Sequence, residues 1–83
     1  MNKYPIEREF KAIGAGGDDF VRAMVAAVES VLGPVPQGAV RLRPSSGGRY
    51  VCVSLGPLHI TGPEQIKRIY AGMKADGRAK FLI

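Results

Sequence analysis

The chain has 83 residues, of which 46% are hydrophobic and 23% are charged. These proportions are ordinary for a globular protein and exclude wholesale disorder, and the length predicts one small domain over residues 1–83. Twelve Lys and Arg against seven Asp and Glu leave a net charge of +5. Such a balance favours weak attraction to polyanions, but it does not establish a nucleic-acid function.

Cysteine usage and hydropathy indicate a compartment. Cys52 is the single cysteine, so an intramolecular disulfide is excluded and nothing suggests an oxidising environment. The start of the chain, MNKYPIEREF, has no apolar signal core, and the longest apolar run, residues 23–28, is far too short to span a bilayer. We therefore expect a cytoplasmic protein without membrane association.

The first predicted element is a strand over residues 4–13, YPIEREFKAI. Its apolar and polar side chains alternate, which is typical of a strand with one wet face. Arg8 falls on the apolar side of the alternation, against the pattern. The core face is expected to hold Ile6, Phe10 and Ala12, and the wet face Glu7, Glu9 and Lys11.

A helix is predicted next, over residues 19–32. The glycine-rich GAGGDD ends the strand, and Asp18 or Asp19 is expected to cap the helix. Gly33-Pro34 ends it, because proline cannot continue the hydrogen-bond ladder. Its apolar stripe consists of Phe20, Met24, Ala27, Val28 and Val31.

The second half of the chain predicts a hairpin, a helix and a last strand. Residues 40–43 and 50–55 alternate in polarity on either side of a turn, as the two strands of a hairpin do. Thr61 and Glu64 have capping-box spacing at the start of the second helix. The stripe of that helix is Ile66, Ile69, Tyr70 and Met73. The final RAKFLI is expected to turn Ala79, Phe81 and Ile83 toward the core.

The element order is therefore β-α-β-β-α-β. Two helices with single apolar stripes and four one-faced strands predict an α+β fold. It is the ferredoxin-like sandwich, with both helices on one face of a four-stranded antiparallel sheet. The expected strand order across this sheet is fourth, first, third, second. If Phe81 faces the core, Phe81→Ala is expected to lower the free energy of unfolding by about 3–5 kcal/mol.

The tip of the predicted hairpin, PSSGGR, allows two interpretations. Pro44, the serines and the glycines are turn residues, and turn chemistry alone accounts for all of them. The same N–H groups can also form a nest for a phosphate or carboxylate. That candidate anion site consists of Arg43, Ser45, Ser46 and Arg49. The tip lacks the spacing of a nucleotide-binding loop.

The hairpin RPSSGGRYVCVSL resembles the KPSSKGxYxSVS hairpin of the YbeD family of small uncharacterised bacterial proteins. EFKAIG followed by DDFVRAMVAAVES is similar to that family's first strand, glycine and helix, and PEQIKRIYAGM to its second helix. The resemblance covers nearly all of residues 4–83. It departs at Gly47, where a lysine is common, at Cys52, where a serine is common, and around GPLH. The missing lysine argues against an anion role for the loop.

What the resemblance implies is mainly a fold, the same sandwich, similar in shape to the regulatory ACT domains that bind amino acids. No catalytic activity is established for the family. In ACT domains the loop after the first strand contacts the ligand, so the resemblance makes Gly14, Gly16 and Gly17 the candidate small-molecule site. A dinucleotide site is disfavoured there, because the third glycine of the fingerprint is missing and two aspartates follow.

No catalytic or metal-binding constellation can be assembled from the sequence. His59 is the only histidine, and no pair of ligands has usable spacing for a metal. Cys52 has no evident histidine neighbour to make it a nucleophile. Glu7 and Glu9 lie two residues apart, as side chains on the wet face of any exposed strand do, so their spacing does not indicate a pair for acid–base catalysis. We expect a protein that is not an enzyme and has no cofactor.

The open sheet face is a further candidate site, as an RNA-binding surface. Sheets that bind RNA in this topology stack bases on aromatic residues of both central strands. Only Tyr50 is available for this, and the central glutamates would repel the backbone. We expect a solvated face on which Arg78 or Lys80 pairs across strands with Glu7 or Glu9.

The sequence thus favours a non-catalytic regulatory or interaction module, similar in shape to ACT domains. Its ligand would be a small anionic metabolite or an unidentified protein partner. The alternative is a weak, salt-dependent nucleic-acid-binding protein without sequence specificity. Arg41 and Arg43 would face their own copies if two second strands paired, so we expect a monomer or at most a weak homodimer.

Overall fold

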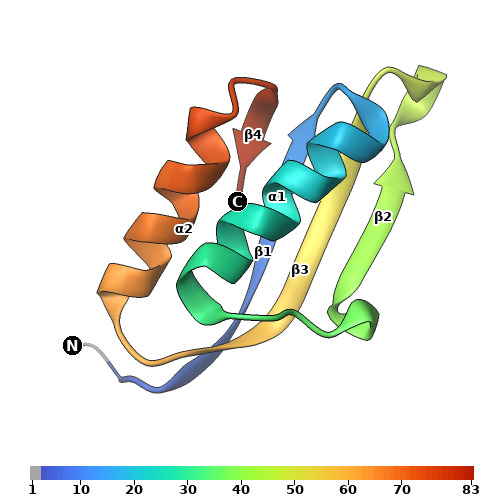
Figure 1. The fold of residues 1–83 in the computed structure, drawn as a ribbon. Coiled ribbons are helices and arrows are strands. Elements are labelled where there is room, and N and C mark those ends of the chain that lie inside the picture. The colour runs from blue at the N-terminus through green and yellow to red at the C-terminus, as the bar shows by residue number, and fades with distance from the viewer. Residues whose placement is uncertain (1–2) are drawn as a thin grey trace.

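The computed structural model describes residues 3–83, apart from the side chain of Ser46. The strands and helices follow one another in the predicted β-α-β-β-α-β order, with two short 3-10 turns before and after the second strand (Figure 1). The elements are β1 (Ile6–Gly14), α1 (Gly17–Leu32), η1 (Gln37–Ala39), β2 (Val40–Pro44), η2 (Ser46–Gly48), β3 (Val51–Ile60), α2 (Pro63–Ala75) and β4 (Ala79–Leu82).

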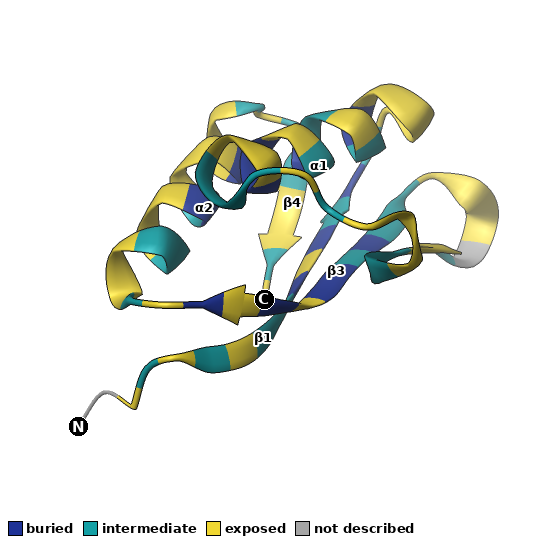
Figure 2. Ribbon diagram, turned by 60° about the horizontal axis from the view of Figure 1, so that its bottom comes forward, coloured by how far each residue is buried: buried dark blue, intermediate teal, exposed yellow. Residues whose placement is uncertain are grey.

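The strands form one antiparallel sheet in the order β2-β3-β1-β4, as predicted. Both helices cover the same face of this sheet and leave the other face open (Figures 1 and 2). The helices also pack on each other, and Gly72 allows their close approach, since a Cβ added there would lie 3.1 Å from the Cβ of Ala27. The α+β arrangement is consistent with the ferredoxin-like fold.

The core lies between the helices and the covered face of the sheet, where the buried residues gather in Figure 2. It includes most of the residues that the apolar stripes and strand parities predict. The fully or nearly fully buried hydrophobic residues are Phe10, Ala12, Phe20, Met24, Ala27, Val28, Val53, Leu55, Leu58, Ile60, Ile69 and Met73.

The expected orientation of β4 is right for Ala79, which packs against the core, and wrong for the two other residues. Phe81 and Ile83 are each 64% exposed, whereas Leu82 packs against the core. Gly14 pairs with Ala79 but Ile13 pairs with Phe81, so β4 holds one more residue than β1 across this step. The extra residue is a β-bulge, and it reverses the side-chain alternation of every residue that follows it.

A second bulge explains why β3 is longer than predicted. Arg8 pairs with Leu58 and Phe10 with Leu55, so β3 advances three positions between these pairs where β1 advances two. Gly56 lies at this step with φ +141°, and a Cβ on it would come within 2.9 Å of the Arg8 carbonyl oxygen. Glycine is required there, and the bulge carries the strand on to Ile60.

Arg8, which broke the predicted alternation, does face the covered side of the sheet. Its guanidinium lies 5.2 Å from the ring centroid of Phe10 and 5.8 Å from that of Tyr70. Its Nη2 donates a hydrogen bond of 2.8 Å to the Tyr70 hydroxyl. Aromatic faces and a phenol oxygen therefore stabilise a cation at a position that the pattern reserves for apolar residues.

The predicted N-caps are wrong, although both helices are present and α1 ends at Gly33 as predicted. Gly16 is the N-cap of α1, with φ 112°, and Asp18 and Asp19 lie in the first turn, where the helix dipole favours acidic side chains. Gly62 is the N-cap of α2. The Thr61 N–H donates to Gln65 Oε1 at 2.7 Å, so the expected box between Thr61 and Glu64 does not form.

Candidate functional site

The predicted glycine site lies at the junction of β1 and α1, and its surroundings are filled. A Cβ on Gly14 would lie 2.6 Å from the ring of Phe20 and 2.5 Å from the carbonyl oxygen of Arg78. A Cβ on Gly16 would lie 2.9 Å from Nη1 of Arg78, whereas Gly17 has open space around it. Packing thus explains the first two glycines, and their role in binding a small molecule stays a prediction.

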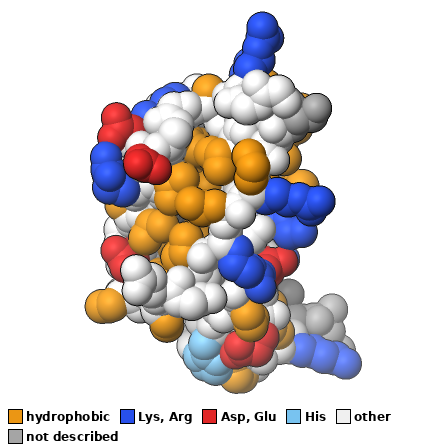
Figure 3. Space-filling view, turned by 90° about the vertical axis from the view of Figure 1, so that its right-hand side faces the viewer, with side chains coloured by type: hydrophobic (Ala, Val, Ile, Leu, Met, Phe, Trp, Pro, Cys, Tyr) orange, Lys and Arg blue, Asp and Glu red, His pale blue; other side chains and the backbone are white. Residues whose placement is uncertain are grey.

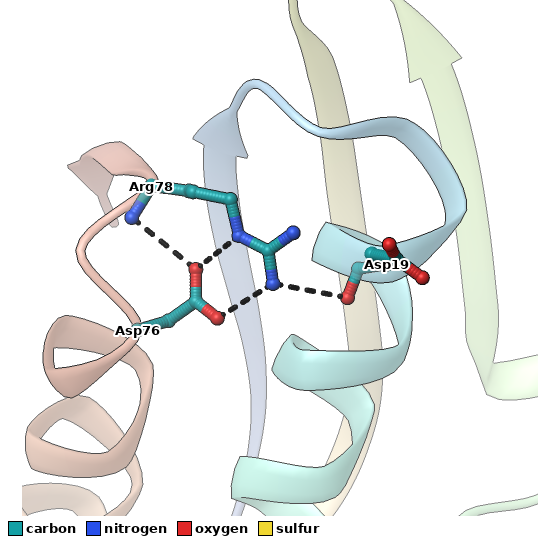
Figure 4. Close-up of polar contacts among 3 residues, drawn as sticks. All are labelled: Asp19, Asp76 and Arg78. Atoms are coloured by element: carbon teal, nitrogen blue, oxygen red, sulfur yellow. Dashed lines mark hydrogen bonds and ion pairs between the residues drawn. The ribbon is translucent and has the colours of Figure 1, made fainter.

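Arg78 closes this end of the molecule over the start of α1 (Figure 4). Its Nε and Nη2 donate to the two carboxylate oxygens of Asp76 at 2.7 and 2.8 Å, and Nη2 also reaches the Asp19 carbonyl oxygen at 3.4 Å. These hydrogen bonds from the guanidinium lower the pKa of Asp76 below its usual value. The expected pairing of Arg78 with Glu7 or Glu9 is therefore wrong.

The hairpin tip uses its own donors. The Ser45 N–H donates to the Tyr50 carbonyl at 2.9 Å, and the Gly48 N–H donates to the Ser45 carbonyl at 3.0 Å. Ser45 Oγ accepts from the Tyr50 N–H at 3.1 Å. Two of the N–H groups proposed for an anion nest thus bond within the turn, which favours the turn interpretation.

Of the other predicted anion ligands, Arg43 and Arg49 are exposed, and the side chain of Ser46 lies outside the described part of the structure. The hairpin and the glycine loop share one end of the sheet (Figure 1). Gly14 pairs with Val51, which in turn pairs with Pro44. The glycine loop leads from β1 into α1 next to Arg78, whereas the hairpin joins β2 to β3.

The open face holds Phe81 and Ile83, which the sequence pattern assigned to the core. Strand register sets its side chains in rows across the sheet. One row runs from β4 to β2 through Phe81, Ile13, Cys52 and Arg43. The next row runs through Ile83, Lys11, Ser54 and Arg41. The β4 side of this face is therefore apolar and the β2 side is basic, and only the bulge in β4 brings Phe81 onto it.

The acidic residues of the open face are paired. Glu9 forms ion pairs with Arg41 and with Lys11, the latter at 3.9 Å. Glu7 lies 3.3 Å from Nδ1 of His59, which is exposed on β3. Within residues 3–83, Arg43 has no carboxylate within ion-pair distance.

A shallow hollow of about 350 Å³ lies beside Arg43. Its walls are formed by Glu9, Lys11, Arg41, Leu42, Arg43 and Ser54. The face thus offers one unpaired guanidinium in a basic hollow next to a strip of apolar side chains.

Two structural absences apply to residues 3–83. The described part of the chain contains no group of three or more His, Cys, Asp or Glu side chains arranged to hold a metal ion. None of its helices is long and apolar enough to cross a membrane.

Fold and surface together define a small α+β module with both helices on one face of its sheet and the other face open. The chain belongs to the family described as a protein of unknown function, DUF493, whose model matches residues 1–83. This is the YbeD family that the hairpin residues indicated.

Two curated relatives agree with this family. The chain is 29% identical over 82 residues to a UPF0250 protein of Azotobacter vinelandii, covering 98% of this chain and 88% of the relative. It is 28% identical over 81 residues to a UPF0250 protein of Ralstonia nicotianae, covering 98% of this chain and 82% of the relative. No solved structure gives a significant match.

Proposed function

We propose that this protein is a non-catalytic interaction module of the cytoplasm that binds an acidic protein partner through the open face of its sheet. The observation that carries the proposal is the pair of side chains at the β4 edge. Phe81 and Ile83 are each 64% exposed, on the same face as Lys11 and Arg43. Aromatic and arginine side chains that become buried together supply most of the binding energy in protein interfaces.

The charges on this face specify the chemistry of the partner. The two rows of open-face side chains contain three basic residues, Lys11, Arg41 and Arg43. Among the described residues, Glu9 is the one carboxylate that forms ion pairs with them, to Lys11 and Arg41. An approaching carboxylate would find Arg43 uncompensated, and the net charge of +5 adds long-range attraction. Binding is therefore expected to weaken as salt is added.

A protein partner suits the site better than the other two ligand classes. The hollow beside Arg43 is too shallow to enclose most of a small anion, as metabolite sites do. For RNA, Phe81 adds an aromatic ring that the sequence alone did not place on this face. It lies on the edge strand, however, and its row neighbours on the central strands are Ile13 and Cys52. Tyr50, the aromatic residue that the sequence offered for stacking, is half-buried and precedes β3, so the two central strands hold no aromatic platform on this face.

The test is capture of partners from the native cytoplasm by the wild-type protein and matched variants. Arg43→Glu and Phe81→Ala are expected to lose the same captured protein. Lys67→Glu, which makes the same charge change at an exposed position of α2, is expected to retain it. If all four proteins capture the same set, the open face is not the binding surface. Parallel titrations with free amino acids and with single-stranded RNA separate the metabolite and nucleic-acid alternatives.

A further inference from the structure

We propose that the acidic partner binds as an extended segment that adds a fifth strand to the free edge of β2. This inference rests on the proposed function, since the same arginines take part. It goes further by naming the form of the partner segment and the pattern of its side chains: acidic residues alternating with apolar ones. Three features of β2 carry it, namely its backbone, its covered-side residues and its charges.

The backbone of β2 leaves one donor and two acceptors unused around Leu42 at its outer edge. Ser45 donates its N–H toward β3, to Tyr50. Because successive residues of an antiparallel strand bond to opposite sides, Arg43 and Arg41 also face β3, whereas Leu42 turns its N–H and C=O groups outward. The Val40 C=O also points outward, but the Val40 N–H donates to the Gln37 carbonyl oxygen. β2 is the last strand on its side of the sheet, so an extended segment can form a short ladder there centred on Leu42.

The covered side of β2 presents one apolar side chain, that of Leu42, which the core leaves largely exposed, whereas Val40 packs against the core. Val40 and Leu42 pair with Leu55 and Val53, which are both fully buried on that side. Leu42 itself is 53% exposed. Figure 3 looks at the β2 edge of the sheet and shows hydrophobic side chains gathered down the middle of the view, with basic side chains around them, including the right margin. Apolar residues of an added strand would cover Leu42 on this side.

The open-face side of β2 requires the opposite chemistry. Arg41 and Arg43 pair with Ser54 and Cys52, so they project from the open face, and both are exposed. Residues of an added strand that lie next to these arginines would be acidic, since opposite charges on neighbouring strands stabilise the pairing. The partner segment therefore alternates apolar and acidic residues with a period of two.

A second copy of the chain fits this edge poorly. In antiparallel pairing of two β2 strands around Leu42, each Arg41 would face the Arg43 of the second copy. Shifting the register by two residues puts Arg41 opposite Arg41 instead. Glu9 compensates Arg41 but leaves Arg43 without a carboxylate among the described residues. Proteins commonly block edge pairing with such charges, so an acidic segment is the better occupant.

The experiment uses the isotopically labelled full chain and a capped heptapeptide of alternating Val and Glu. Two N-methylated versions carry the methyl groups either on every Val or on every Glu. Only one of these sets points its N–H groups at β2, which set depending on strand direction. We expect that set to weaken binding about tenfold or more and the other set to change it little. A peptide with the same composition in two blocks, VVVVEEE, is expected to bind more weakly than the alternating one.

Two further readouts complete the design. The Leu42 amide is expected to gain protection from hydrogen exchange when the alternating peptide binds. Arg43→Glu is expected to weaken binding of the Glu peptide and to strengthen binding of its Val-Lys counterpart. Arg43→Glu changes an exposed side chain, so the fold is expected to persist. The amide spectrum of the labelled variant shows directly whether it is folded.

Three results would overturn strand addition. The first is equal affinity for both N-methylated peptides, with shifts centred on Phe81 and Ile13, which would leave the proposed function intact. The second is the absence of binding at millimolar peptide. The third is protection of the Leu42 amide that rises with protein concentration alone, because a second copy would then occupy the edge. The proposed function fails separately, if Arg43→Glu and Phe81→Ala leave the captured proteins unchanged.

Discussion

The two faces of the sheet treat the same residue type in opposite ways. Phe10 in β1 is fully buried on the covered face, with its ring 5.4 Å from that of Tyr70 at an interplanar angle of 65°. Phe81 in β4 is 64% exposed on the open face. Both fall on apolar positions of a simple alternation, and only the bulge in β4 separates them. One extra residue in a strand thus moves an aromatic side chain from the core to the exposed face of the sheet.

The largest expected effect is on the covered face. Phe10→Ala removes a fully buried ring that packs against α2, and we expect it to lower the free energy of unfolding by about 3–5 kcal/mol. Urea denaturation followed by circular dichroism measures the loss. For a domain of this size that is a large part of the total stability. A loss below about 1 kcal/mol would mean that the site collapses around the truncation and that the core is looser than its burial indicates.

A glycine on the covered face should show how tightly the β1–α1 junction is packed. Gly14→Ala places a Cβ 2.6 Å from the ring of Phe20, and we expect a cost of about 1–3 kcal/mol from overpacking. Gly38→Ala is the matched control, because nothing lies within 4 Å of a Cβ there. Thermal denaturation of both variants decides the matter. Equal midpoints would show that the Phe20 ring moves aside freely and that the glycine is not needed for packing.

The contact that anchors β4 just before its bulge should respond to acid. Arg78 lowers the pKa of Asp76 in the folded state, so the pair stabilises the fold fully above the carboxyl group's unfolded pKa. That stabilisation is lost as the pH falls through this value toward the lower, folded one. Asp76→Asn should therefore flatten the acid limb of stability against pH.

Asp18→Asn is the comparison variant for that titration, because Asp18 is an exposed carboxylate outside the ion pairs found among residues 3–83. It loses only the interaction with the α1 dipole, so its acid limb should change less than that of Asp76→Asn. Urea midpoints measured between neutral and strongly acidic pH provide the comparison. The same acid limb in wild type and Asp76→Asn would show that the pair contributes no pH-dependent stability.

The smallest expected effect on stability is at Phe81. Its exposed ring makes Phe81→Ala cost less than about 1 kcal/mol, in contrast to the 3–5 kcal/mol expected of an inward ring. The same urea measurement as for Phe10→Ala gives the answer. A loss comparable to that of Phe10→Ala would mean that β4 lacks the bulge and turns Phe81 inward.

Much of the architecture could be read from the sequence, because it depends on local periodicity. The stripes of α1 and α2 predict which helix residues are buried, and Met24 and Ile69 are indeed fully buried. The alternation around Phe10 identifies the covered face of β1 as well. These patterns hold because burying one apolar face is the dominant stabilising term, and it acts on every turn and every second strand residue.

The candidate sites were harder to predict, because they depend on contacts between distant segments. The glycines of the β1–α1 loop suggested a ligand site, yet Gly14 is explained by Arg78 and Phe20, and Arg78 lies more than sixty positions along the chain. The hairpin residues suggested an anion nest, yet Ser45 forms its hydrogen bonds with Tyr50 inside the turn. The sequence shows which hydrogen-bond donors and acceptors a loop contains, but not which other residues of the folded chain already contact them.

The sequence by itself determined the element order and the two helix stripes of this protein, because periodicity and turn chemistry are local properties. Tertiary structure alone decided which residues of β4 lie on the open face. Each bulge, opposite Arg8 and opposite Ile13, is one extra residue in a strand relative to its partner. The sequence of one strand alone does not show which residue will be the extra one. Parity beyond a bulge follows the partner strand, so the exposure of Phe81, and with it the proposed binding surface, emerges only when β4 pairs with β1.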